Sequence, residues 1–165
     1  MEFHITSVKL RDVVDDLAPI VGPQFAAKNL DYTTQLFEQS IEVEADGGKL
    51  TQVLINLLNN AAKFTPPGGR VALETQTGAP SAGGKATVQI IVRDTGIGIP
   101  ADKLQAVFDP FVQLDASPGA RRQGTGLGLA ISRDLARGMG GELTVESAPG
   151  VSTAFTLSLT KSTGS

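Results

Sequence analysis

Residues 49–64 constrain the fold more than any other part of the chain. Their apolar side chains recur at helical spacing and form one wide stripe, which is typical of a helix packed on a sheet. The stripe consists of Leu50, Val53, Leu54, Leu57, Leu58 and Ala61. The pattern stops before Pro66-Pro67-Gly68-Gly69, which is a strong helix terminator. The sequence therefore predicts an amphipathic helix with one face committed to a core.

The rest of the chain alternates between strand-like and helical patterns. Strands are expected at residues 3–10, 32–37, 41–45, 71–77, 86–93, 142–147 and 153–160. Further helices are expected at residues 11–30, 101–107 and 126–138. Pro19 and Pro23 lie inside the first of these, where we expect a kink or break. Hairpin-like neighbours among the strands favour a mixed sheet, so the predicted fold class is α/β.

Composition limits the classes of function. The 165 residues are 41% hydrophobic and 19% charged, which indicates one globular domain. A formal net charge of −3 gives no reason to expect binding to nucleic acid or direct contact with a membrane. The absence of cysteine excludes disulfides and thiolate metal sites, and is compatible with a reducing cytosol. No apolar run reaches the roughly 20 residues that a membrane span needs. Residues 161–165 are expected to be a frayed tail.

Three polar residues share a narrow arc of the helix at 49–64. Asn56, Asn60 and Lys63 follow one another at helical spacing, beside the apolar stripe. An asparagine oxygen is a suitable ligand for Mg²⁺, and a lysine one turn further could attract phosphates. The alternative is that the asparagines bond locally and that Lys63 is a solvated helix end.

Two glycine clusters are harder to explain by folding alone. Asp94-Thr95-Gly96-Ile97-Gly98 follows a predicted strand, so the carboxylate could accept a hydrogen bond from an exocyclic amine such as that of adenine. It could equally be an ordinary turn. Gly124-Thr125-Gly126-Leu127-Gly128 enters a helix, where free amides and the helix dipole favour phosphate. A dinucleotide-binding motif is disfavoured because no strand precedes this cluster, and a P-loop because no G-K-[ST] follows it. Arg121 and Arg122 could close over a triphosphate or lie in solvent.

Two further features are weaker. Phe108-Asp109-Pro110-Phe111 places two aromatic residues before an irregular stretch, as a hinge anchor or a core plug. His4 is the only histidine, and a structural or surface role is expected for it.

Together these segments resemble the catalytic ATP-binding domain of bacterial sensor histidine kinases, within the wider family shared with gyrase-type ATPases. Residues 56–65 resemble its N box, 94–98 its first glycine box, 108–111 its F box and 124–128 its second glycine box. Residues 150–155 resemble its weaker final glycine box, with Ser152 where glycine is usual. Residues 111–117 resemble the lid entry of hybrid-type kinases. The resemblance covers residues 5–160.

The resemblance implies a two-layer α/β sandwich in which residues 1–160 form one domain, with three helices on a mixed sheet and an ATP lid at 112–123. It implies ATP and Mg²⁺ as ligands, with Asn60 on the metal and Asp94 on the adenine amine. The implied nucleotide-binding residues are Asn56, Asn60, Lys63, Asp94, Gly96, Gly98, Ile99, Gly124, Thr125, Gly126, Leu127 and Gly128. The implied catalytic residues are Asn56, Lys63, Arg121 and Arg122; the arginine spacing leaves open which one reaches the γ-phosphate.

The same resemblance implies phosphoryl transfer rather than hydrolysis. Hydrolytic relatives carry a glutamate as general base where this chain has Asn56, and an amide cannot abstract a proton at neutral pH. His4 lacks the sequence context of a phosphoacceptor, so the expected partners are a histidine-bearing dimerisation domain of the parent protein and a response regulator. The expected location is the cytoplasm. The alternatives are a non-catalytic nucleotide-binding module and an anti-sigma-type serine kinase of the same fold.

Overall fold

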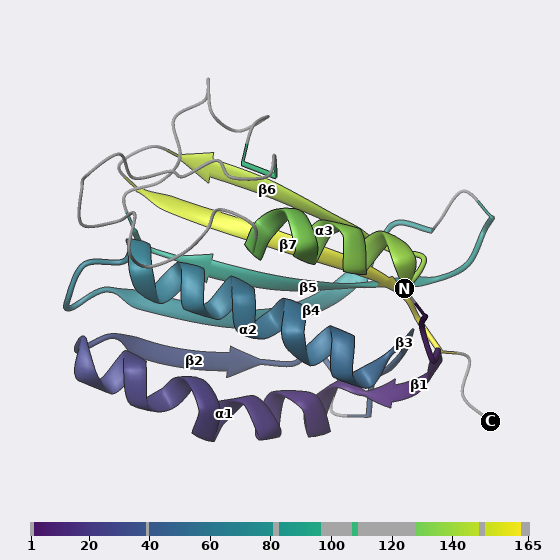
Figure 1. Ribbon diagram of the computed structural model, residues 1–165, viewed down its shortest axis with the longest axis horizontal. Coiled ribbons are helices and arrows are strands. Elements are labelled where there is room, and N and C mark those ends of the chain that lie inside the picture. Colours follow the sequence, from purple (N-terminus) through teal and green to yellow (C-terminus); the bar gives the residue numbers. More distant parts are fainter. Residues whose placement is uncertain are drawn as a thin grey trace.

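The computed structural model describes residues 2–38, 40–80, 83–96, 107–108, 128–148 and 151–162. Helices and strands form two layers, with the helices packed side by side on one face of the main sheet (Figure 1). The helices are α1 (Leu10–Ala27), α2 (Gly47–Phe64) and α3 (Gly128–Gly138). The strands are β1 (Thr6–Lys9), β2 (Asp31–Gln35), β3 (Glu42–Ala45), β4 (Arg70–Gly78), β5 (Thr87–Asp94), β6 (Glu142–Ala148) and β7 (Ser152–Thr160). The predicted α/β class is confirmed.

The main sheet is mixed. Its five strands lie in the order β2-β4-β5-β7-β6, with β2 parallel to β4 and the other neighbours antiparallel. β1 and β3 form a separate antiparallel pair, which a bridge between Val43 and Lys161 joins to the end of β7. This order puts β5 in the centre, so the residue that ends it is flanked by strands on both sides.

α2 is the central helix of the core. Leu50, Leu54, Leu57 and Leu58 have no exposed surface, as the apolar stripe predicts. The helix begins after Asp46, whose Oδ1 accepts a hydrogen bond from the Lys49 amide at 3.2 Å. This N-cap satisfies one of the amides that have no partner within the helix. From this cap, α2 runs from the side of the chain termini toward the opposite end of the molecule (Figure 1).

Of the kink or break expected in α1, a break does not occur, because the helix continues through both prolines. Each proline removes the hydrogen bond to the carbonyl four residues earlier, which leaves the carbonyls of Asp15 and Pro19 without that donor. Asp15, Pro19 and Pro23 are all exposed, so water can reach these carbonyls. The opposite face is held by buried side chains of Leu17, Val21 and Phe25. Burial of that face outweighs the loss of the two bonds.

Some boundaries also differ from the sequence predictions. The first strand covers only Thr6–Lys9, and Leu10 already belongs to α1. Lys161 and Ser162 are not frayed, since their amides donate to the carbonyls of Ala86 and Glu42 at 2.9 Å each. The expected tail from 161 onward is therefore wrong for these two residues. The expected lid at 112–123, and residues 101–106 of the expected helix, lie outside the described residues.

Candidate functional site

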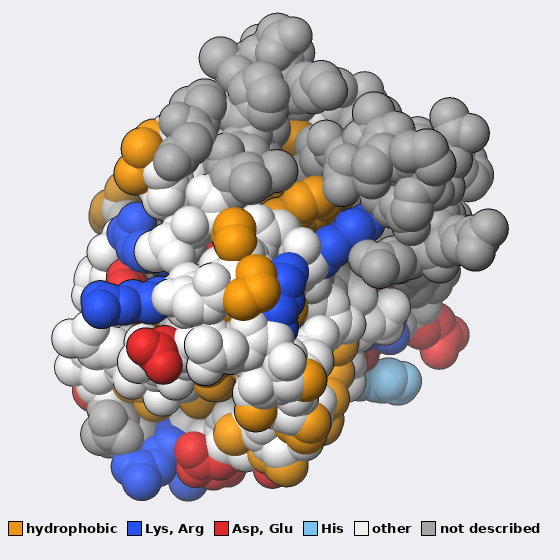
Figure 2. Space-filling view, turned by 90° about the vertical axis from the view of Figure 1, so that its left-hand side faces the viewer, with side chains coloured by type: hydrophobic (Ala, Val, Ile, Leu, Met, Phe, Trp, Pro, Cys, Tyr) orange, Lys and Arg blue, Asp and Glu red, His pale blue; other side chains and the backbone are white. Residues whose placement is uncertain are grey.

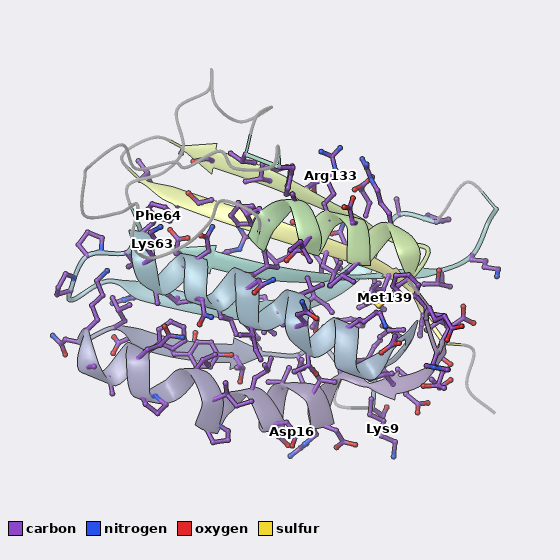
Figure 3. All side chains as sticks on the ribbon, viewed as in Figure 1. Lys9, Asp16, Lys63, Phe64, Arg133 and Met139 are labelled. Atoms are coloured by element: carbon purple, nitrogen blue, oxygen red, sulfur yellow. The ribbon has the colours of Figure 1, made fainter. Side chains whose placement is uncertain are left out.

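The polar face predicted on α2 exists as a face of a helix. Asn56, Asn60 and Lys63 lie at helical spacing within α2, and each is partly exposed beside the buried leucines. Lys63 and Phe64 end the helix on the left of Figure 3, where the Lys63 ammonium lies 5.2 Å from the centre of the Phe64 ring. These three side chains therefore line the half of α2 that is distant from the chain termini.

A residue of the neighbouring helix α3 holds the Asn56 side chain in place. Its Nδ2 donates to Ser132 Oγ of α3 at 3.1 Å, and Ser132 is fully buried. With the amide nitrogen engaged in this way, the Asn56 Oδ1 is the atom left to accept a hydrogen bond or bind a cation. Ser132 was not predicted as a site residue. The only signal in the sequence is a hydroxyl on the buried side of α3, three residues before Leu135.

Asp94 ends β5 as a buried carboxylate. Its exposed fraction is 6%, and its Oδ1 accepts a hydrogen bond from the Gly96 amide at 2.8 Å. Burial raises the pKa of Asp94, and the Gly96 bond offsets part of that shift. Among the described residues no bond to the second carboxylate oxygen is seen, and a carboxylate with little solvent is suited to accept a hydrogen bond there from a ligand amine.

Gly96 brings the end of β5 against the end of α2. A Cβ atom at this position would lie 2.5 Å from the Phe64 carbonyl oxygen and 2.8 Å from Asp94 Oδ1. No side chain fits there without displacing the backbone of α2, which explains the requirement for glycine. Asp94 and the last turn of α2 are thus parts of one contact.

Thr153 is a second buried polar residue beside Asp94 that the sequence reasoning missed. It pairs with Asp94 across β5 and β7, its exposed fraction is 5%, and its Oγ1 lies 3.3 Å from Ser147 Oγ. Its place in the final glycine box was visible in the sequence. Its position opposite Asp94 depends on the strand order, which the sequence did not reveal.

Phe108 is packed against the sheet and α3. Its ring contacts Phe155 of β7 edge-on at 6.2 Å between centroids, and the Arg133 guanidinium of α3 lies 4.9 Å from its centre. This agrees with the interpretation of Phe108 as a core plug, while the hinge that it was expected to anchor lies outside the described residues. Phe111 lies outside the described residues.

Most of the second glycine cluster is outside the described part of the chain. The predicted site residues that lie outside the described part are Gly98, Ile99, Arg121, Arg122, Gly124, Thr125, Gly126 and Leu127. Gly128 is described, and it begins α3 with an exposed backbone. In Figure 1, α3 begins beside the middle of α2 and runs toward the chain termini. The described site residues of α2 and β5 lie in the half of the molecule that is distant from the chain termini.

Cationic side chains are present on this end of the molecule. Viewed toward it, separate groups of Lys and Arg side chains lie on the face, with Asp and Glu side chains among them (Figure 2). Among the described residues, no group of three or more His, Cys, Asp or Glu side chains could hold a metal ion. The amide oxygens of Asn56 and Asn60 are hard donors, which fit Mg²⁺ when phosphate oxygens and water complete its shell.

Comparison with known proteins gives consistent matches. Residues 45–163 match the family described as histidine kinase-, DNA gyrase B- and HSP90-like ATPase. The sensor protein GacS of Pseudomonas syringae pv. syringae is 38% identical over 154 residues, which is 91% of this chain and 16% of GacS. The chain thus spans about a sixth of the length of that relative.

Solved structures agree with the sequence matches. The catalytic domain of histidine kinase ThkA superposes with a TM-score of 0.80 at 26% identity, covering 98% of this chain and 97% of that one. Full-length ShkA, in a complex with AMPPNP, gives 0.82 at 29% identity over 100% of this chain and 33% of its own. No helix among the described residues is long and apolar enough to cross a membrane.

Proposed function

Since this chain belongs to the histidine kinase-, DNA gyrase B- and HSP90-like ATPases, as the catalytic ATP-binding domain of a sensor histidine kinase, we propose that it transfers the γ-phosphate of Mg-ATP to a histidine of a partner domain. The observation that carries the proposal is the contact between Asp94, Gly96 and the end of α2. It joins a buried carboxylate to a helix end that bears two asparagines and a lysine.

In this proposal Asp94 recognises the adenine. Its second carboxylate oxygen accepts a hydrogen bond from the exocyclic amine, and its burial makes the absence of that donor costly. Thr153, on the neighbouring strand, offers a hydroxyl beside it. Gly96, Gly98 and Ile99 are proposed to follow the base.

Asn60, Asn56 and Lys63 are proposed to serve the phosphates. Asn60 is the proposed Mg²⁺ ligand, while Asn56 and Lys63 contact metal-bound phosphates; when bound, the ion neutralises developing charge. The backbone at 124–128 is proposed to hold phosphates, and Arg121 or Arg122 to reach the γ-phosphate. ShkA, a structural relative, was solved with AMPPNP, which supports a nucleotide ligand for this chain too.

The chemistry of residue 56 favours transfer over hydrolysis. Asn56 uses its nitrogen to bond Ser132 and has no group that can take a proton from water. The acceptor is proposed to be a histidine on a dimerisation domain of the parent protein, with a response regulator receiving the phosphate afterwards. Neither nucleic acid nor direct membrane contact is part of this proposal, and the proposed location is the cytoplasm.

His4 is a poor acceptor by position. Its backbone amide bonds Asp46 at the start of α2, whereas Lys63 lies at the other end. At 1.5 Å per residue, the 17 residue steps from Asp46 to Lys63 separate the two by about 25 Å. The isolated chain is therefore expected to bind nucleotide without phosphorylating itself.

Calorimetric titration with ADP, with and without Mg²⁺, tests the binding roles. Asp94→Ala is expected to abolish measurable binding, since the base loses its recognition group. Asn60→Ala is expected to retain magnesium-free binding and lose the gain that Mg²⁺ brings. Unaltered binding by Asp94→Ala would contradict the proposed site.

A second assay tests the transfer. Labelled ATP, this chain and a separate dimeric histidine-bearing domain should give an acid-labile phosphate on that domain only. Phosphate incorporated into this chain alone would contradict transfer in trans. Acid-stable phosphate on a partner would indicate a serine kinase instead.

A further inference from the structure

We infer that Lys28 is a positioning residue for the phosphate-binding face, because its ammonium group holds the turn of α2 that carries Lys63. The inference rests on the proposed function. Lys28 Nζ donates to the carbonyl oxygens of Ala62 at 2.7 Å and Lys63 at 3.1 Å. A residue of α1 thus binds the backbone of a proposed phosphate ligand.

The two carbonyls that Lys28 binds belong to the unsatisfied end of α2. The last four carbonyls of a helix have no donor within it, and they form the negative end of its dipole. The Ala61 carbonyl accepts from the Thr65 amide at 3.0 Å, and the Phe64 carbonyl faces Gly96. Lys28 supplies the charged donor for the remaining two. The final turn is therefore supported on one side by the Asp94 loop and on the other by α1.

Lys28 is itself fixed by the way α1 ends. Asn29 has a positive φ of 57°, and the amides of Asn29 and Leu30 donate to the carbonyls of Ala26 and Phe25 at 3.1 and 2.8 Å. This is a Schellman motif, with Leu30 and Phe25 both buried. The Asn29 carbonyl then accepts from the Gly68 amide at 2.9 Å, just beyond α2. The backbone next to Lys28 is therefore tied to the segment that directly follows the turn its ammonium binds.

A second contact repeats the arrangement one turn earlier. Gln24 of α1 donates its side-chain amide to Asn59 Oδ1 of α2, next to Asn60. α1 and α2 run side by side and end at the same side of the molecule (Figure 1). The end of α1 thus supports the two turns with the metal and phosphate groups. Asp94 belongs to β5, which is on the other side of the α2 terminus.

Because Lys28 supports the turns with the phosphate groups and not Asp94, its loss should weaken phosphate contacts and leave recognition of the adenine base unchanged. In Lys28→Met the stem is retained and both hydrogen bonds are lost, so the Lys63 backbone is free to shift. Affinity for Mg-ADP is expected to fall about tenfold, as small displacements of aligned groups can produce. Affinity for adenosine, which has no phosphate, is expected to stay unchanged.

The experiment compares four chains with both ligands, using calorimetry for Mg-ADP and a chemical-shift titration for adenosine. They are the unaltered chain, Lys28→Met, Lys28→Arg and the control Lys9→Met, at the other end of α1 (Figure 3). Lys28→Arg, which keeps a charged donor, should restore most of the Mg-ADP affinity, and Lys9→Met should match the unaltered chain. Thermal unfolding verifies that each variant is folded. If Lys28→Met does not fold, Lys28→Gln takes its place.

Three results would decide against the inference. Unchanged Mg-ADP affinity in the folded Lys28 variant would overturn it, as would an equal loss for adenosine, which would mark a purely structural role. Failure of Lys28→Arg to bind better than Lys28→Met would also overturn it. If the unaltered chain failed to bind Mg-ADP, the proposed function would be contradicted, and this inference would fall with it.

Discussion

Asp94 is a residue whose ligand role conflicts with its contribution to stability. Burial raises its pKa, so the folded chain holds a proton there more strongly than the unfolded chain does. Stability from this group is consequently present below the ordinary aspartate pKa and is lost as pH rises through the raised value. Above that raised pKa, the ionised carboxylate is a cost that the nucleotide-free protein carries.

Removing the Asp94 charge should therefore stabilise the folded chain while impairing its recognition of adenine. Asp94→Asn keeps an oxygen for the Gly96 amide, and we expect a higher melting temperature at pH 7. Each 1 kcal/mol gained corresponds to a rise of about 2–4 °C for a domain of this size. The gain should shrink as pH falls through the raised pKa of Asp94, because the native carboxyl then becomes protonated too. An unchanged or lower melting temperature at pH 7 would contradict this interpretation.

The sequence was sufficient for some site residues and insufficient for others, for a physical reason. Asn56, Asn60 and Lys63 could be grouped because helical periodicity alone places them on one face. Ser132, Thr153 and Lys28 could not, since each acts through a contact set by the packing of separate elements. Local patterns predict which way a side chain points along its own element. They do not identify which residue of another element that side chain contacts.

Among the elements, α2 combines a strong start with an end that other segments must support. Asp46 caps its start and accepts hydrogen bonds from the backbone amides of His4 and Lys49, with a further bond and an ion pair from the Lys49 ammonium. These interactions, the His4 bond first, lower the pKa of Asp46 to about 2.

Acid should therefore weaken the start of α2. A lowered pKa gives stability that is present above the ordinary aspartate pKa near 3.8 and is lost as pH falls toward 2. Asp46→Asn keeps a capping oxygen but not the charge, so its stability is expected to fall less steeply between pH 4 and pH 2. Chemical denaturation at several pH values would measure this. Asp16→Asn, on the exposed part of α1, removes one carboxylate elsewhere and should behave like the unaltered chain (Figure 3).

The contrast between α1 and α2 shows where element prediction succeeds. The stripe and terminator of α2 agree with its packing, so its bounds were nearly right. In α1 the prolines argue against a helix locally, yet both lie on the exposed side. Whether a lost hydrogen bond faces water or core is a tertiary property. The predicted helix at residues 11–30 is therefore confirmed, while the break expected at its prolines is wrong.

At the scale of the whole molecule, the two ends of the described chain meet. Ser7 of β1 and Ser162 are hydrogen-bonded through their side chains, and the Ser162 amide donates to the Glu42 carbonyl. The nucleotide-binding groups proposed above lie at the opposite end (Figure 1). The connection between the termini is thus separate from the site.

A circular permutant should exploit this separation. Joining the ends by a short Gly/Ser linker and opening the chain between Gly83 and Gly84, which are exposed, breaks no strand pairing. We expect cooperative unfolding and Mg-ADP affinity within about threefold of the original, because contacts at the far end are unaltered. Loss of the cooperative transition would show that the native order of the elements is itself required.

The meeting of Ser7 and Ser162 also has a mechanical consequence. Any segments that continue from the two ends would enter and leave at one corner, beside β1 and β3. A displacement between those segments would act on that corner and rotate the whole domain about it. The strands around Asp94 would then change position without a change in their own structure.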